Sequence, residues 1–186
     1  MEADWEFEVG GDSPVLSACW PGFVDLRLTP ERAGDLPEAA QLPGLAAALE
    51  RLNAPNSPVW TSKCDLWETP EPDGFDCDEL DAPPGCSAHV VSCYIDLLPR
   101  SSDEWSDPHR TEASCKELCR SFGRVALRSC RVDLVVRGAL TTPDHLSLGI
   151  TAYLTACGAT LAEAKGALEG ALAAFADALC PHATLQ

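Results

Sequence analysis

The sequence predicts an α+β protein in which helices cover one face of a β-sheet. Three observations lead to this expectation. Several short segments alternate between apolar and polar residues, three segments carry apolar residues at helical spacing, and proline- or glycine-rich stretches separate them. The chain has 186 residues, of which 46% are hydrophobic, and this is enough for one domain with a substantial core.

The N-terminal half is expected to contain three strands and one helix. Residues 5–9 alternate and end at two glycines, and residues 12–22 contain the prolines and glycine of a loop. Residues 23–28 alternate again before a Thr-Pro dipeptide. Leucines spaced three and four apart predict a helix over residues 42–52, and residues 59–68 are expected to form a strand.

The second half begins with a long loop over residues 69–87, which holds four prolines and many acidic residues. Residues 89–98 then alternate as a strand does. The next helix is expected to be capped by Thr111 or Ser114 and to run to about residue 124.

Two strands and a helix complete the chain. Residues 129–139 and 146–157 are expected to be strands, and Thr160 with Glu163 has the spacing of a capping box for the last helix. From residue 23 onward the order is therefore that of a ferredoxin-like βαββαβ antiparallel sheet with helices on one face, extended by one strand and a C-terminal helix. The single domain of residues 1–186 divides into an N-terminal strand and loop (1–22), two βαβ units (23–138) and the extension (139–186).

Four apolar-Asp-Leu triplets form a weak internal repeat, one in each of four expected strands. Because side chains alternate across a strand, their carboxylates are expected on the face that the helices leave open. Trp60 is expected to point to the core and Trp67 to the open face. The residues expected on the open face are Asp25, Arg27, Lys63, Asp65, Trp67, Tyr94, Asp96, Arg131, Asp133, Arg137 and Tyr153.

The chain is strongly acidic, with a formal net charge of −16. Residues 1–86 hold 18 acidic and 4 basic residues, whereas residues 87–186 hold 11 and 9. This charge repels nucleic acid and anionic lipid and attracts basic partners. The long loop carries an acidic run that lacks the residue order of a calcium loop. Its acidic residues are Asp73, Asp76, Asp78, Glu79 and Asp81.

The ten cysteines are expected to be reduced and mostly to pack as small apolar groups. Cys115 and Cys119 lie on the apolar stripe of a helix, so core packing is the simpler interpretation. Cys157 is the thiol expected to be exposed. Cys77 and Cys86 flank the acidic loop and are expected to pair only under oxidising conditions.

The N-terminus is acidic where a signal peptide would be basic, and no run of 18 apolar residues exists, so we expect a cytoplasmic protein without a membrane span. The four histidines are scattered, and no GxSxG, HExxH, P-loop or GxGxxG motif occurs. The sequence therefore predicts no catalytic residue, no cofactor and no metal site, and it favours a protein that is not an enzyme.

Three hypotheses for function remain. The first is a non-enzymatic binding or regulatory protein of inhibitor or immunity type, which uses the acidic loop and the open sheet face to bind a basic protein partner. The second is a metal-binding protein or small metal-dependent enzyme that uses the sheet-face aspartates Asp25, Asp65, Asp96 and Asp133. The third is a structural module that forms a homodimer and has no ligand.

Overall fold

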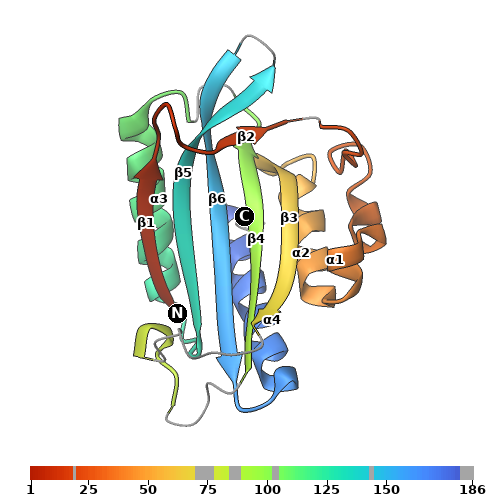
Figure 1. The fold of residues 1–186 in the computed structure, drawn as a ribbon, viewed down its shortest axis with the longest axis vertical. Coiled ribbons are helices and arrows are strands. Elements are labelled where there is room, and N and C mark those ends of the chain that lie inside the picture. The colour runs from red at the N-terminus through yellow and green to blue at the C-terminus, as the bar shows by residue number, and fades with distance from the viewer. Residues whose placement is uncertain (19, 70–77, 84–88, 102–104, 143–144, 181–186) are drawn as a thin grey trace, which may run out of the picture.

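The chain folds into a mixed α+β structure with a sheet in front and helices behind it (Figure 1). The computed structural model describes residues 1–18, 20–69, 78–83, 89–101, 105–142 and 145–180. Within these ranges the sheet has six strands in the order β1-β5-β6-β4-β3, and β2 pairs with β5 beside that path. The elements are β1 (Glu2–Glu8), β2 (Val15–Ser17), η1 (Pro30–Asp35), α1 (Pro37–Ala40), α2 (Pro43–Asn53), β3 (Val59–Thr69), η2 (Asp78–Leu80), β4 (His89–Pro99), α3 (Pro108–Gly123), β5 (Cys130–Thr142), β6 (His145–Gly158) and α4 (Leu161–Leu179).

The main core lies between the sheet and α2, α3 and α4. The apolar stripes that predict α2 and α4 are confirmed, since Leu49, Leu172 and Phe175 are all buried in this core. The expected start of α4 is also confirmed. The Thr160 hydroxyl accepts a hydrogen bond from the Glu163 backbone N–H (3.2 Å), and the Glu163 carboxylate accepts one from the Thr160 N–H (3.3 Å).

Helix α3 begins earlier than the sequence predicts. Its N-cap is Asp107, whose carboxylate accepts a hydrogen bond from the backbone N–H two residues later (2.7 Å), and Pro108 occupies the first position. The expectation that Thr111 or Ser114 caps the helix was therefore wrong. Proline is favoured at a first helical position because its fixed φ suits the helix and it has no N–H to satisfy there.

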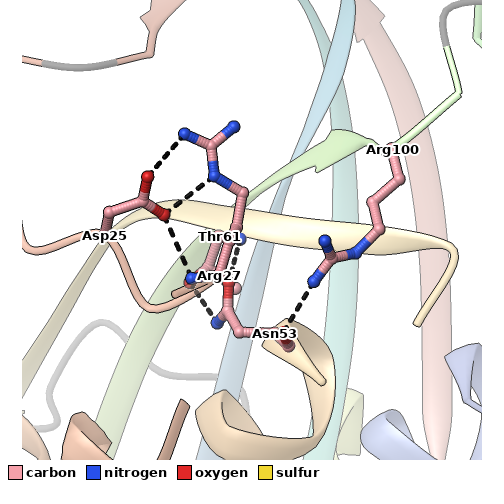
Figure 2. A network of polar contacts seen from close by, with 5 residues as sticks. All are labelled: Asp25, Arg27, Asn53, Thr61 and Arg100. Atoms are coloured by element: carbon pink, nitrogen blue, oxygen red, sulfur yellow. Dashed lines mark hydrogen bonds and ion pairs between the residues drawn. The ribbon is translucent and has the colours of Figure 1, made fainter. Parts of the chain in front are cut away.

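Residues 23–28 do not form the expected strand. Asp25 instead closes a turn, because its carboxylate accepts hydrogen bonds from the Arg27 backbone N–H (3.0 Å) and guanidinium (2.8 and 2.7 Å) (Figure 2). The Leu28 N–H also bonds back to the Asp25 carbonyl (3.2 Å). Aspartate often offers the backbone such a local alternative to a sheet ladder. As a result Leu26 is buried, whereas Leu28 is 80% exposed.

The sheet is mixed, so the expectation of an antiparallel sheet was wrong in part. β3, β4, β6 and β5 pair antiparallel as expected, but β1 and β2 run parallel to β5. β1 forms the edge of the sheet beside α3, and the Met1 ammonium donates to the Val125 carbonyl at 2.7 Å. The alternation in this segment indicated a strand but carried no information about its partner or direction.

A bulge in β3 reverses the expected direction of Trp60. The register against β4 shifts between Thr61 and Cys64, so Trp60 lies opposite Leu98. Leu98 is on the same side of β4 as Tyr94 and Asp96, because side chains alternate along the strand. Trp60 packs in a small second cluster on that side, together with Leu16, Leu98 and Ala139. An extra residue in one strand inverts the side-chain alternation beyond it, and this is why Trp60 does not point to the main core.

In the described part of the chain, no helix is both long and apolar enough to cross a membrane.

Candidate functional site

The face of the sheet opposite the helices carries the candidate site, and strand pairing determines which side chains meet there. Asp65 lies opposite Tyr94, Tyr94 opposite Tyr153, Tyr153 opposite Asp133, and Asp133 opposite Asp4 of β1. Directly paired residues share a face. The sheet therefore aligns these five side chains in one row across its open face.

Aromatic rings form a ladder in the middle of this face, which we define as Trp67, Tyr94 and Tyr153. The ring centroids of Trp67 and Tyr94 are 6.3 Å apart, and those of Tyr94 and Tyr153 are 6.0 Å apart, with both pairs tilted. Trp67 remains 38% exposed. Exposed aromatic area of this kind supplies contact surface at low conformational-entropy cost.

Arg137 is held at one end of the ladder. Its guanidinium pairs with the Glu8 carboxylate at 2.8 Å and donates to the hydroxyls of Thr151 (3.2 Å) and Tyr153 (3.3 Å). Thr151 in turn donates to the carboxylate of Asp96 at 2.7 Å. Arg137 thus connects the edge strand β1 with the centre of the sheet through side chains that satisfy one another.

Asp96 is the buried carboxylate of the open face, with only 6% of the residue exposed. Burial raises its pKa above the ordinary value, while the Thr151 hydroxyl and the charges of Arg137 and Lys63 offset part of the rise. The Asp96 carboxylate is therefore part of the hydrogen-bond network of Thr151 and Arg137 and is not exposed to solvent.

Arg131 and Asp133 form a second charged group near β1. Their side chains are 2.7 Å apart, and Asp4 and Glu79 each lie 3.8 Å from the same guanidinium. Burial raises the pKa of Asp133, and the neighbouring carboxylates of Asp4 and Glu79 add to this, against the lowering effect of Arg131. A cavity of about 180 Å³ lies here, with Glu6 also in its lining. Carboxylates outnumber the single cation in this group.

Two chain segments cover the ends of the open face. At one end the chain between β1 and α1 crosses in front of the sheet (Figure 1), and Leu16 and Phe23 pack against Trp60 there. At the other end Leu80 of η2 packs on Val90 and Cys157. Cys157 is only 1% exposed, so the expectation of an exposed thiol was wrong, because the end of the acidic loop covers it.

The structure brings together most of the residues expected on this face. Strand pairing places the following there: Asp65, Trp67, Tyr94, Asp96, Arg131, Asp133, Arg137 and Tyr153. Lys63 lies in the bulged part of β3, and its charge acts on Asp96 of this face. Asp25 and Arg27 are the exception, because they lie in a turn outside the sheet. There Arg27 stacks over the Trp60 ring at 4.0 Å. The four aspartates therefore do not share one surface.

The acidic loop lies only partly within the described ranges. Asp73, Asp76, Cys77 and Cys86 fall outside them, and Asp78 begins η2. Beyond it, Glu79 approaches the guanidinium of Arg131, and Asp81 pairs with Arg128 at 3.5 Å. The described end of the loop thus adds its carboxylates to the margin of the open face.

The described core thiols fit the expectation of packing rather than chemistry. Burial raises the pKa of Cys64 and Cys115 to about 12 and that of Cys119 and Cys130 to about 11. Thiols with such pKa values carry almost no thiolate at neutral pH. Among the described residues, no cluster of three or more His, Cys, Asp or Glu side chains has the arrangement to hold a metal ion.

Sequence reasoning missed the partner of Arg137. Glu8 meets it across 129 positions of sequence, and only the parallel pairing of β1 with β5 brings the two side chains together. Period-two alternation in β1 was the available signal, but alternation does not identify a neighbouring strand. Comparisons of the chain with protein-family models, with curated proteins and with solved structures gave no match.

Proposed function

We propose that this protein is a non-enzymatic binding protein of inhibitor or immunity type, which engages a basic protein partner through the open face of its sheet. One observation carries the proposal: the aromatic ladder, with Trp67 exposed, shares the open face with carboxylates that outnumber the cation beside them, as Asp4, Glu79 and Asp133 do around Arg131. Protein interfaces favour aromatic side chains at their centre, and opposite charge steers association.

The margins of the face support the same partner chemistry. Glu79 and Asp81 are the last two residues of the acidic run at one end, and Asp4 and Glu6 belong to the edge strand. The described cations of this region are mostly paired within the molecule, as Arg137 is with Glu8. A partner would therefore meet an acidic rim around an aromatic centre.

We also propose a ferredoxin-like central part for the fold, in an altered chain order. β4, α3 and β5 form a split βαβ unit, since β6 lies between two strands that are antiparallel to it. β6 and β3 form a second such pair, with β4 between them and antiparallel to both. α4, which follows β6, occupies the place of the helix in this second unit, but β3 precedes β6 in the chain instead of following α4. Such a fold leaves one sheet face available for contacts.

The proposal is tested by affinity capture with a charge-matched pair of variants. The double variant D4N/D65N removes two exposed carboxylates of the open face, and E31Q/E50Q removes two exposed carboxylates elsewhere. We expect the wild type and E31Q/E50Q to retain the same basic proteins, released by salt, and D4N/D65N to lose them. Captured proteins that are not basic, or that D4N/D65N retains equally, would contradict the proposal.

A further inference from the structure

Aromatic rings in this protein repeatedly carry a cation. Lys63 lies 5.7 Å from the ring centroid of Trp20, and Lys116 lies 5.6 Å from that of Trp5. A cation over an aromatic face is attracted by the ring quadrupole, most strongly for tryptophan.

In two further cases the cation is a guanidinium that a carboxylate also holds. Arg27 lies 4.0 Å from the centroid of the Trp60 ring and 2.7 Å from Asp25. Arg137 lies 5.8 Å from the centroid of Tyr153 and 2.8 Å from Glu8. In both cases a guanidinium lies near a ring and is also held by a carboxylate. Arg27 lies close over its ring, whereas Arg137 lies farther from the ring and also donates to the Tyr153 hydroxyl.

Trp67 has the same surroundings without the cation. Asp65 is two residues earlier on the same face of β3, and Tyr94, directly opposite Asp65, is tilted against the Trp67 ring. In the part of the chain that the structure describes, no cation lies over Trp67, and the one hydrogen bond of the Asp65 carboxylate comes from the Leu66 N–H (2.8 Å). Lys63, the nearest cation along the strand, is directed to Trp20.

We infer that an arginine side chain of the partner stacks on Trp67 and Tyr94 and donates its hydrogen bonds to the carboxylate of Asp65. This inference rests on the proposed function, and it specifies the chemical group that the open face recognises. The exposed ring offers the stacking surface, and the exposed carboxylate offers two acceptor oxygens.

Arginine fits this position better than lysine does. A guanidinium is planar, weakly hydrated and able to donate two parallel bonds to one carboxylate while it stacks on a ring. A lysine ammonium is a compact, strongly hydrated charge that supplies neither feature. Of the three internal sites that combine a ring with a carboxylate, two hold arginine, at positions 27 and 137. The third holds Lys116, which lies 5.6 Å from the Trp5 centroid and pairs with Glu112.

The test is an NMR titration of the full chain with N-acetyl-arginine amide, and with N-acetyl-lysine amide as the matched probe. We expect the Trp67 indole N–H and the Tyr94 ring signals to shift saturably, with arginine binding about two- to fivefold tighter than lysine. W67A should abolish the shift at Tyr94, and D65N should weaken binding about two- to fivefold.

F7A provides the control for loss of an exposed aromatic side chain. Phe7 is 40% exposed, similar to Trp67, but it packs edge-on to Trp5, which contacts the core on the helix side of the sheet. Binding in F7A should equal that of the wild type, and a dispersed amide spectrum of each variant shows that it is folded.

The outcomes separate this inference from the proposed function. Trp67 signals that do not move, or that move equally with the lysine probe, overturn the arginine site. If D4N/D65N still loses its basic proteins in that case, the binding function stands without the arginine site. Saturable, arginine-selective shifts that disappear in W67A support the site.

Discussion

Replacing Asn53 with alanine should destabilise the protein strongly, because the side chain joins α2 to β3 inside the core. Asn53 is fully buried, and its amide N–H₂ donates to the Leu49 carbonyl and to the Thr61 hydroxyl, both at 2.8 Å. Its carbonyl oxygen accepts from the Thr61 backbone N–H at 3.1 Å (Figure 2). The structure thus shows three hydrogen bonds made by one buried amide.

The expected magnitude follows from these contacts. Alanine removes all three bonds and leaves the Thr61 N–H without its acceptor in a buried position. A lost hydrogen bond costs about 0.5–1.5 kcal/mol, and an unsatisfied buried donor costs about 1–3 kcal/mol. The better helix propensity of alanine offsets about 0.5 kcal/mol of this. We expect N53A to lower the free energy of unfolding by about 3 kcal/mol.

Urea denaturation with linear extrapolation measures this change, and thermal unfolding should show a decrease in Tm of about 6–12 °C for a chain of this size. The bonds from Arg100 to the carbonyls of Asn53 (2.6 Å) and Ala54 (3.0 Å) involve only the backbone, so N53A retains them. N56A, at a nearby exposed asparagine, is the control and should change stability by less than about 0.5 kcal/mol. A loss in N53A no larger than that in N56A would refute the reasoning.

Two further predictions concern a close helix contact and a buried charge. G44A should destabilise the protein by about 1–3 kcal/mol, because a Cβ on Gly44 would lie 2.6 Å from a side-chain atom and 3.1 Å from a backbone atom of α4. G166A, at a position of α4 where a Cβ would meet no other atom, should instead stabilise the protein by about 0.5–1 kcal/mol. Chemical denaturation measures both variants, and equal stabilities would exclude the close contact of Gly44 with α4 as the cause. D96N tests the buried carboxylate. Because the pKa of Asp96 is raised in the folded protein, the folded state binds this proton more tightly than the unfolded chain does. The contribution of Asp96 to stability therefore decreases as the pH rises from 3.8, the ordinary pKa of the group, through the raised pKa. The stability of D96N relative to wild type should therefore increase over that range in denaturation measured at several pH values, and a difference independent of pH would count against it.

The apolar-Asp-Leu repeat shows which features of the fold a local sequence pattern can predict and which it cannot. Asp65, Asp96 and Asp133 all lie on strands with their carboxylates on the open face, as alternation predicts. Asp25 has the same neighbours in sequence, yet its carboxylate closes a turn with Arg27. Arg131 is likewise two residues from Asp133 and donates to its carboxylate at 2.7 Å, but within strand β5. Neither the triplet nor a nearby arginine therefore distinguishes the two outcomes by itself.

The order of the strands decided the rest of the candidate site. Glu8 meets Arg137 only because β1 joins the edge of the sheet in parallel to β5, and Trp60 faces the open side only because β3 contains a bulge. Asp96 is buried although its sequence setting resembles that of the exposed Asp65. Each of these depends on which segment lies next to the residue in space.

The sequence by itself determined where the longer helices α2, α3 and α4 and most strands form, because the spacing of apolar residues and the capping residues act within one segment. It also determined the acidic character and the aromatic and aspartate positions from which the open face is built. It did not indicate β2, η1, α1 or η2. Only the tertiary structure decided which charges are paired, which are buried, and that Trp67 and Asp65 have no described cation beside them. The reason is that pairing and burial arise from contacts between segments far apart in the chain. The periodicity of apolar residues within one segment does not identify which other segments will lie beside it.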